Sequence, residues 1–542
     1  MGVLATTLWW TFSLLHGLVF LEQIRGSQLW TVVHDTSGSA DLPPLDCSTK
    51  TKIRTVDGTC NDLNHPWSGS RFYRFGRASP LEDVKSDTFI GVGGLPNPRT
   101  LAHNLLARKN GETTYAPQQN LIAAAWIQFQ THDWFQHMNS PKSGDTINVP
   151  VLIGDPMWKA FGANVMSISK TLQDTTGSKK VPLAYQNNQT HWWDLSQVYG
   201  TDAALLDKLR SHKGGKLIMD SQDLIPLGPN GIEITGFSNN WWLGLSLMHN
   251  LFAKNHNMIC DKLAKAYPTM TDEDLFQKAR LINAAISAKI HTTEWTPALL
   301  ANEHLYTGMN ANWRGVEALQ YPPLVGYQNP DPINVTYQFP EEFHPPKPIQ
   351  QFRHKLNGCP HSQKLPNSIN KPPLPTGETI DLSTIDLVRD RERGIPRYNA
   401  YRRLMNLPPK LLFSDISSDP QTAADLALLY AGDIEAVDLL VGSLAEDARP
   451  TGFAFSETTF RLFMSVASRR ISADRLFTTD YTADAADMKS LLIGAFPELK
   501  GAGLEKVANP FLVWDDAGVQ GKWVEMEMSV KKQLDLAVAQ MG

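Results

Sequence analysis

The feature that most constrains the fold of this chain is the helical spacing of its apolar residues, which prevails from about Leu101 onward. Apolar side chains recur every three or four positions, and few segments show the alternation that is typical of strands. Pro and Gly mark the loops between these segments. We therefore predict a mainly α-helical protein, with helices over residues 118–138, 240–265, 272–291 and 456–472, the third of them capped by Thr271.

The length and composition limit the class of protein. The chain has 542 residues and a formal net charge of −5, with 42% hydrophobic and 19% charged residues. These values are typical of a globular enzyme and exclude a disordered, collagen-like or polytopic membrane protein. They also argue against a strongly basic protein that binds nucleic acid.

The N-terminal segment has an unusual run without charge, which covers residues 2–21. This run is compatible with a membrane span, with a long signal-peptide core, or with a helix that lies in the membrane interface. All three interpretations make residues 1–30 a membrane-associated, signal or anchor segment, in the endoplasmic reticulum or the secretory pathway. No second span of this kind follows in the sequence, so we expect the rest of the chain to be soluble.

Four cysteines are too few for a disulfide framework in a chain of this size. Cys47 and Cys60 could pair across a short loop, which requires an oxidising compartment. Cys260 and Cys359 have neither a nearby cysteine nor the spacing of a metal site.

Polar side chains interrupt the apolar face of the helix predicted over residues 118–138. Gln128 and His132 lie four residues apart on that face, which Phe135 would share. A buried imidazole beside an amide can handle protons above a haem or another oxidant. The alternative is a histidine that only packs in the core. Asp133 points about 100° away from His132 around the helix and needs a separate explanation.

The segment THWWDLS offers that explanation for Asp133. Thr190, Trp192, Asp194 and Ser196 alternate, so an extended loop can wrap hydroxyl, carbonyl and carboxylate oxygens around one ion. Together with Asp133 the set has two carboxylates and only oxygen ligands, which Ca²⁺ prefers. An ordinary polar turn is the alternative.

Arginines provide candidate anion sites. Arg389 and Arg393 lie four residues apart and form a fork that suits a propionate or a phosphate, although a solvated charged face is the alternative. Arg469 and Arg470 follow an apolar stretch, so we expect one of them to point into the interior, and a buried arginine requires an anion. His291 and Thr296 could supply further donors to a carboxylate.

Several segments together resemble one family, the animal-type haem peroxidase superfamily, and within it the fatty-acid α-dioxygenases. The similarity covers about residues 53–500, in the same order. It rests on the segments IQFQTHDWFQH, THWWDLSQVYG, HNLFAKNHNMICDKL, ARLINAAISAKIHTTEWTPALL, RDRERGIPRYN and FSETTFRLFMSVASRRISADRLF. The resemblance implies a helical fold of the cyclooxygenase and α-dioxygenase type with few short strands, within a domain of about residues 50–510 that is followed by a C-terminal tail, 511–542.

The resemblance also implies roles for individual residues. His132 matches the distal haem histidine, with Gln128 one turn before it, and Arg389 and Arg393 match arginines that contact haem b. The remaining matches are calcium ligands at Asp133, Thr190, Trp192, Asp194 and Ser196, and groups that hold the fatty-acid carboxylate at His291, Thr296 and Arg469.

The chemistry of the family follows as a further implication. Oxidised haem converts a tyrosine into a radical, which removes a hydrogen from the carbon next to the carboxylate of a long-chain fatty acid. O₂ then adds to carbon 2 and gives a 2-hydroperoxy acid. Holding the carboxylate decides which carbon meets the radical, so this is catalysis by positioning.

The sequence departs from the family in one interval. The family carries Tyr-x-x-His there, which supplies the radical and the proximal iron ligand, but no such motif occurs between residues 297 and 388. Residues 322–378 are instead an irregular, Pro-rich insert, so the proximal ligand is unknown. The histidines available there are His344, His354 and His361. Two explanations account for the missing motif. The chain is either the product of an altered transcript of an active enzyme or a natural variant with weak or no haem binding.

Two other functions remain open. A peroxidase that uses H₂O₂ is less favoured because the segment GFSNNWW has Ser238, Asn239 and Asn240 where peroxidases of this superfamily carry a distal Arg and a haem-linking Glu. The other alternative is a haem-free pseudoenzyme or a lipid-binding scaffold.

Overall fold

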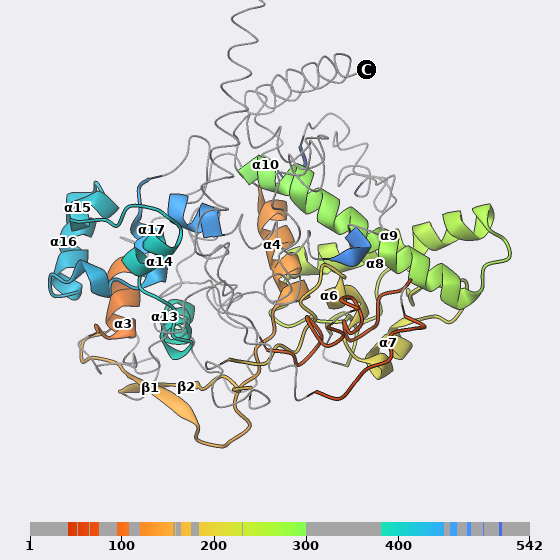
Figure 1. Cartoon of the computed structure of the whole chain (residues 1–542), viewed down its shortest axis with the longest axis horizontal. Helices are drawn as coiled ribbons and strands as arrows, with labels where there is room; N and C mark the ends of the chain where they lie inside the picture. Colours follow the sequence, from red (N-terminus) through yellow and green to blue (C-terminus); the bar gives the residue numbers. More distant parts are fainter. Residues whose placement is uncertain are drawn as a thin grey trace, which may run out of the picture.

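The protein is mainly helical in the computed structural model, as the sequence predicts, with one small sheet (Figure 1). The structure describes residues 42–50, 52–63, 65–74, 95–107, 120–155, 158, 164–174, 184–229, 231–299, 381–448, 456–462, 474–477, 492 and 509–511. Its elements are α3 (Pro98–Leu101), η4 (Ala102–Leu106), α4 (Leu121–Trp134), β1 (Thr146–Pro150), β2 (Val165–Ser169), α6 (Ser196–Tyr199), α7 (Ala203–Leu209), α8 (Leu243–Ala266), α9 (Asp272–Ile290), η6 (His291–Trp295), α10 (Thr296–Leu299), α13 (Leu382–Glu392), α14 (Tyr398–Leu404), α15 (Phe413–Ile416), α16 (Pro420–Leu429), η9 (Ile434–Ala436), α17 (Leu439–Ala445) and η10 (Arg475–Phe477).

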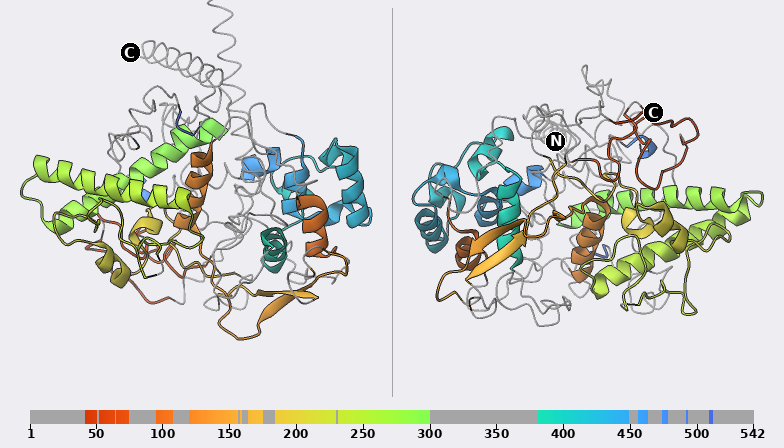
Figure 2. Two further views of the ribbon diagram at one scale, coloured as in Figure 1. Left: turned by 180° about the vertical axis from the view of Figure 1, so that it is seen from behind. Right: turned by 90° about the horizontal axis from the view of Figure 1, so that it is seen from below.

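The long helices α8 and α9 lie side by side, and α4 packs against α8 (Figures 1 and 2). Their bounds agree within three residues with the predicted helices over 240–265 and 272–291. Aromatic rings join α4 to α8, since Phe129 stacks on Phe252 with 5.1 Å between ring centroids. One continuous hydrophobic core includes residues of α4, α8 and α9 together with residues of α14, α16 and α17 (Figure 1).

Helix α4 differs from its prediction in length and in exposure. It ends at Trp134, and Phe135 is extended (φ −132°, ψ 121°), so Phe135 does not share a helix face with His132. All residues from Ala123 to Trp134 are buried, so the helix has no solvent-facing side. An all-round buried helix must satisfy every polar side chain it carries, which makes Gln128, His132 and Asp133 informative.

Helix α9 begins with the N-cap that the sequence predicts. The Thr271 hydroxyl accepts a hydrogen bond from the Asp274 amide at 3.2 Å, and the Asp274 carboxylate accepts one from the Thr271 amide at 3.3 Å. This reciprocal pair satisfies two amides that the first turn leaves unpaired. At its other end α9 continues into the π-helix η6, which begins at His291.

The small sheet supports α13. Strands β1 and β2 pair antiparallel, with Thr146 opposite Ser169 and Pro150 opposite Val165. The inward side chains of both strands pack together with Val388 of α13. Buried ion pairs hold α13 at two further points, through Arg391 with Asp438 and through Arg99 with Asp381.

Cys47 and Cys60, which the sequence leaves as a possible pair, form a disulfide in the structure. Cys260 is buried and reduced. The disulfide closes part of the segment 42–74, which lies against the loop that precedes α6. Gly58 and Gly69 both have positive φ there, and a Cβ at Gly69 would lie only 2.7 Å from the Trp192 ring.

Several predictions fall outside the described residues: the membrane-associated segment 1–30, the insert 322–378, the tail after Phe511, and residues 463–472 of the last predicted helix. Residues 457–462 of that helix are helical. Within the described part of the chain, no helix is long and apolar enough to cross a membrane.

We predict that Thr271→Ala lowers the free energy of unfolding by about 1 kcal/mol, because it removes the N-cap of α9. Urea denaturation measures the change. Thr269→Ala is the matched control, because Thr269 is exposed in the turn before the cap. Equal losses in both variants would contradict a specific capping effect.

Candidate functional site

His132 is buried near the C-terminal end of α4, as the sequence predicts. The ring of Phe237 meets it edge-on, with 4.5 Å between centroids. Gln128 lies one turn earlier on the same helix, and its amide is held by the segment that leads into α8. The Gln128 Nε2 donates to the Asn240 carbonyl at 3.1 Å, and its Oε1 accepts from the Trp242 Nε1 at 2.7 Å. Gln128 therefore fixes the loop beside His132.

Asp133, the next residue, faces a different set of partners. Its Oδ1 accepts hydrogen bonds from the Ser196 amide at 2.6 Å and from the Ser196 hydroxyl at 3.0 Å. The same Ser196 amide lies 3.1 Å from Asp194 Oδ1. The residue between them, Leu195, has φ 58° and turns the chain into α6. The structure thus brings both predicted carboxylates together around the first residue of α6.

This carboxylate pair has the chemistry of a cation site. Asp133 and Asp194 are each 1% exposed. The buried guanidinium of Arg280, on α9, lies 3.5 Å from Asp194. Thr190 Oγ1 is buried and has no hydrogen-bond partner among the described residues. A hard cation would satisfy that oxygen and offset the repulsion between the two carboxylates.

The loop that contains Trp192 is held by a contact with the segment 42–74. The Trp192 indole donates to the Gly58 carbonyl at 2.8 Å, so its side chain is used for packing and only its carbonyl remains for an ion. The described residues contain no group of three or more His, Cys, Asp or Glu side chains that could hold a metal. The predicted set has only two carboxylates, and its other oxygens come from hydroxyls and a carbonyl.

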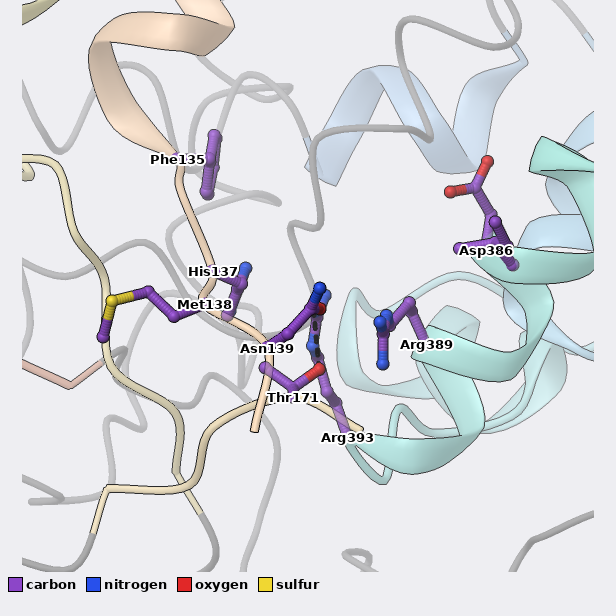
Figure 3. A pocket seen from close by; sticks show the side chains of 9 residues that line it. Phe135, His137, Met138, Asn139, Thr171, Asp386, Arg389 and Arg393 are labelled. Carbon is purple, nitrogen blue, oxygen red and sulfur yellow. Dashed lines mark hydrogen bonds between the residues drawn. The ribbon is translucent and has the colours of Figure 1, made fainter. Parts of the chain in front are cut away.

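Arg389 and Arg393 line a cavity of about 220 Å³ between α13 and the chain that follows α4 (Figure 3). Arg393 is 2% exposed, so the alternative of a solvated charged face is wrong for this pair. Arg389 donates to Glu392 at 2.7 Å, and Arg393 donates to the Thr171 hydroxyl at 3.3 Å. Asp386 also lines this cavity, so the two arginines stand beside two carboxylates, Asp386 and Glu392, and their guanidinium groups are the donors that an anion would use there.

His137 lines the same cavity and was not predicted as a site residue (Figure 3). Burial and the positive charges of Arg393 and Arg389 hold the pKa of His137 well below its usual range. The imidazole is therefore neutral beside the two arginines. The sequence carries His137 within IQFQTHDWFQH, but the end of α4 at Trp134 takes it off the helix face.

His291 lies at the junction of α9 and η6, inside a cage of indole rings. The Trp126 Nε1 donates to His291 Nδ1 at 3.2 Å, so the proton of the neutral imidazole is on Nε2. Burial lowers the pKa of His291 to about 3. The Trp295 ring stacks on the imidazole with 4.6 Å between centroids, and Trp134 and Trp193 contact it edge-on. His291 is thus a neutral donor in apolar surroundings.

Thr296 lies one π-helical turn beyond His291. Its hydroxyl donates to the His291 carbonyl at 2.7 Å. The hydroxyl hydrogen is therefore used within the helix in this conformation. The third predicted member of the carboxylate group, Arg469, lies outside the described residues.

Comparisons with known proteins identify the family of the chain. The animal haem peroxidase family model matches residues 53–346 and 349–489. The α-dioxygenase PIOX of Nicotiana tabacum is 31% identical, over 85% of this chain and 83% of the relative. The solved fatty acid α-dioxygenase of Arabidopsis thaliana superposes with a TM-score of 0.77 at 27% identity, over 94% of this chain and 91% of the other. A point variant of the Oryza sativa fatty acid α-dioxygenase, solved with palmitic acid, gives 0.76 at 27% identity, over 92% and 93%.

The chain therefore belongs to the animal haem peroxidase family of haem-dependent oxidoreductases. Within this family it groups with the α-dioxygenases, which confirms the predicted resemblance and fold class. The similarity to a peroxidase-type relative is lower, since peroxinectin A of Dictyostelium discoideum is 25% identical over 80% of this chain.

We predict that acidification destabilises the fold because buried histidines must stay neutral. The pKa of His291 is about 3 in the folded protein, against 6.5 for an ordinary histidine. Below pH 6.5 the imidazole is therefore protonated in the unfolded chain but stays neutral in the folded protein. This stabilising contribution is complete above pH 6.5 and decreases by about 1.4 kcal/mol for each pH unit of acidification.

His291→Gln tests this contribution. Between pH 6 and pH 5 the variant should lose about 1.4 kcal/mol less unfolding free energy than the unchanged protein, as measured by urea denaturation. His212→Asn is the control, since His212 is exposed. An unchanged pH slope in His291→Gln would refute the neutral, buried state of His291.

Proposed function

We propose that the protein is a haem-dependent fatty-acid α-dioxygenase, which adds O₂ to carbon 2 of a long-chain fatty acid and forms a 2-hydroperoxy acid. The observation that carries the proposal is the set of buried, chemically matched groups in a chain 31% identical to plant α-dioxygenases: His132, the cavity of Arg389 and Arg393, and His291. The palmitic acid in the rice α-dioxygenase structure supports a long-chain fatty acid as the substrate class.

The described residues fit haem b. His132 is a buried imidazole on α4, and the buried Arg393 with the partly buried Arg389 forms a cationic pair at a cavity, which suits propionates. When bound, haem would supply the oxidising equivalents for hydrogen removal. In this proposal His132 holds and moves a proton on the distal side, and Gln128 keeps the loop of Asn240 and Trp242 beside it.

The substrate carboxylate would be held by His291, Thr296 and Arg469. The neutral His291 carries its proton on Nε2 inside an apolar cage, which strengthens a hydrogen bond donated to a carboxylate. Thr296 can donate only if its hydroxyl turns away from the His291 carbonyl. Fixing the carboxylate positions carbon 2 for reaction.

We also propose Ca²⁺ as a structural cofactor at Asp133, Thr190, Trp192, Asp194 and Ser196. The paired buried carboxylates and the orphaned Thr190 hydroxyl support this ion. Its role would be to hold the end of α4, and with it the adjacent His132, against the start of α6.

A second candidate function is a haem-free, lipid-binding protein. It is favoured by one observation, the absence of Tyr-x-x-His between residues 297 and 388. That absence removes both the expected proximal iron ligand and the expected tyrosine. Transcript sequence around residues 338–378 bears directly on this choice, because a Tyr-x-x-His exon there would restore both groups.

For the location we propose the endoplasmic reticulum or another part of the secretory pathway, with the N-terminal segment at a membrane. The Cys47–Cys60 disulfide supports an oxidising compartment. The uncharged run over residues 2–21 supports attachment to a membrane.

The first test uses palmitic acid, a Soret spectrum and an oxygen electrode. We predict a haem spectrum and O₂ uptake with formation of the 2-hydroperoxy acid, and at least an approximately hundredfold loss of uptake in His132→Ala because the distal proton-handling group is removed. His212→Asn is the control. Unimpaired turnover in His132→Ala would refute the assignment, and iron near zero with palmitic acid still bound would favour the second candidate.

The second test measures calcium. We predict that Asp194→Asn purifies with less than the one equivalent of Ca²⁺ expected for the unchanged protein, because it removes one of two carboxylate ligands. Elemental analysis provides the readout. Asp202→Asn is the matched control, since Asp202 is an exposed carboxylate that caps α7. Full calcium content in Asp194→Asn would contradict the site.

A further inference from the structure

His249 is a buried histidine that none of the roles above uses. It lies in the second turn of α8 and is 0% exposed. Neither of its ring nitrogens has a hydrogen-bond partner among the described residues. A neutral imidazole has one donor and one acceptor, and buried polar groups almost always find partners. His249 therefore points to a small molecule that supplies both.

The packing of α4 against α8 determines what His249 faces. Moving along α4, Trp126 contacts Phe252 at 5.8 Å between ring centroids, and Phe129 contacts both Phe252 at 5.1 Å and His249 at 5.5 Å. Residues closer to the C-terminus of α4 therefore contact residues closer to the N-terminus of α8. One turn after Phe129 on α4 is His132.

This register places His132 and His249 on facing turns of the α4 and α8 interface. Burial and, second, the charge of His132 lower the pKa of His249, which agrees with this register. The Phe129 ring closes one side of His249, and the Phe237 ring closes one side of His132. An apolar ring therefore flanks each of the two polar imidazoles.

We propose that His249 is a positioning residue that binds an ordered water molecule between itself and His132. The water would satisfy the His249 ring and orient the proton that His132 holds or moves. This inference rests on the distal role proposed for His132. It assigns His249 no direct contact with substrate or haem.

The first experiment is a high-resolution crystal structure of the protein as purified, with or without haem. We expect electron density for a water within hydrogen-bond distance of a His249 ring nitrogen and on the side of His132. A dry contact, with both nitrogens against carbon atoms only, would overturn the proposal. This readout does not depend on enzymatic activity.

The second experiment measures the association rate of cyanide with the haem-loaded protein by stopped-flow spectroscopy. HCN must give up its proton to a distal base, so His249→Leu should slow association at least about tenfold. His249→Gln, which keeps a donor and an acceptor, should retain most of the rate. Met248→Leu is the control, because it changes a neighbouring buried side chain without removing a polar group.

The outcomes separate this inference from the proposed function. An unchanged cyanide rate in a folded His249→Leu protein overturns the inference and leaves the α-dioxygenase assignment intact. Slow association in both His249→Leu and His249→Gln, with wild-type rates in Met248→Leu, would assign the effect to packing and also overturn it. A protein that turns over normally after His132→Ala refutes the assignment, whereas the crystallographic water still decides the role of His249.

Discussion

The hydrogen bonds between Asp133 and Ser196 are the constraint on which the candidate site depends. They join the last turn of α4 to the first residue of α6 at 2.6 and 3.0 Å, in surroundings that exclude water. An unpaired carboxylate this deeply buried would destabilise the folded protein by several kcal/mol, so the folded state requires the Asp133 contact. Because His132 precedes Asp133 on the same helical turn, the contact that fixes Asp133 also fixes the backbone from which the His132 side chain projects.

Helix α9 connects this point to the proposed carboxylate-binding group. Arg280 meets Asp194 at the proposed calcium site, and His291 follows eleven residues later. Eleven residues are about three helical turns, so both side chains lie on one face of the helix. Between them, Ser287 accepts a hydrogen bond from Gln130 of α4 at 2.9 Å. One helix face therefore sets the spacing between the proposed ion site and the proposed substrate anchor.

Short-range sequence patterns were sufficient to predict the features that depend on residues close together in the sequence. It located α8, α9 and the Thr271 cap, and the alternation in THWWDLS put the calcium candidates on one loop. It could not predict the burial of Arg393, because that depends on Thr171, 222 residues away. For the same reason the Trp126 to His291 bond, across 165 residues, and the role of His137 had no signal in the sequence.

Among the described residues, the contacts that hold helix α13 and its arginine pair come from outside the interval that lacks Tyr-x-x-His. Asp381 caps α13 and pairs with Arg99, Val388 packs on the sheet, and Arg391 pairs with Asp438. All of these partners lie outside residues 300–380. These described contacts involve no residue of that segment. The two candidate functions therefore differ in what that one segment would supply, an iron ligand and a tyrosine, rather than in the described contacts that hold α13.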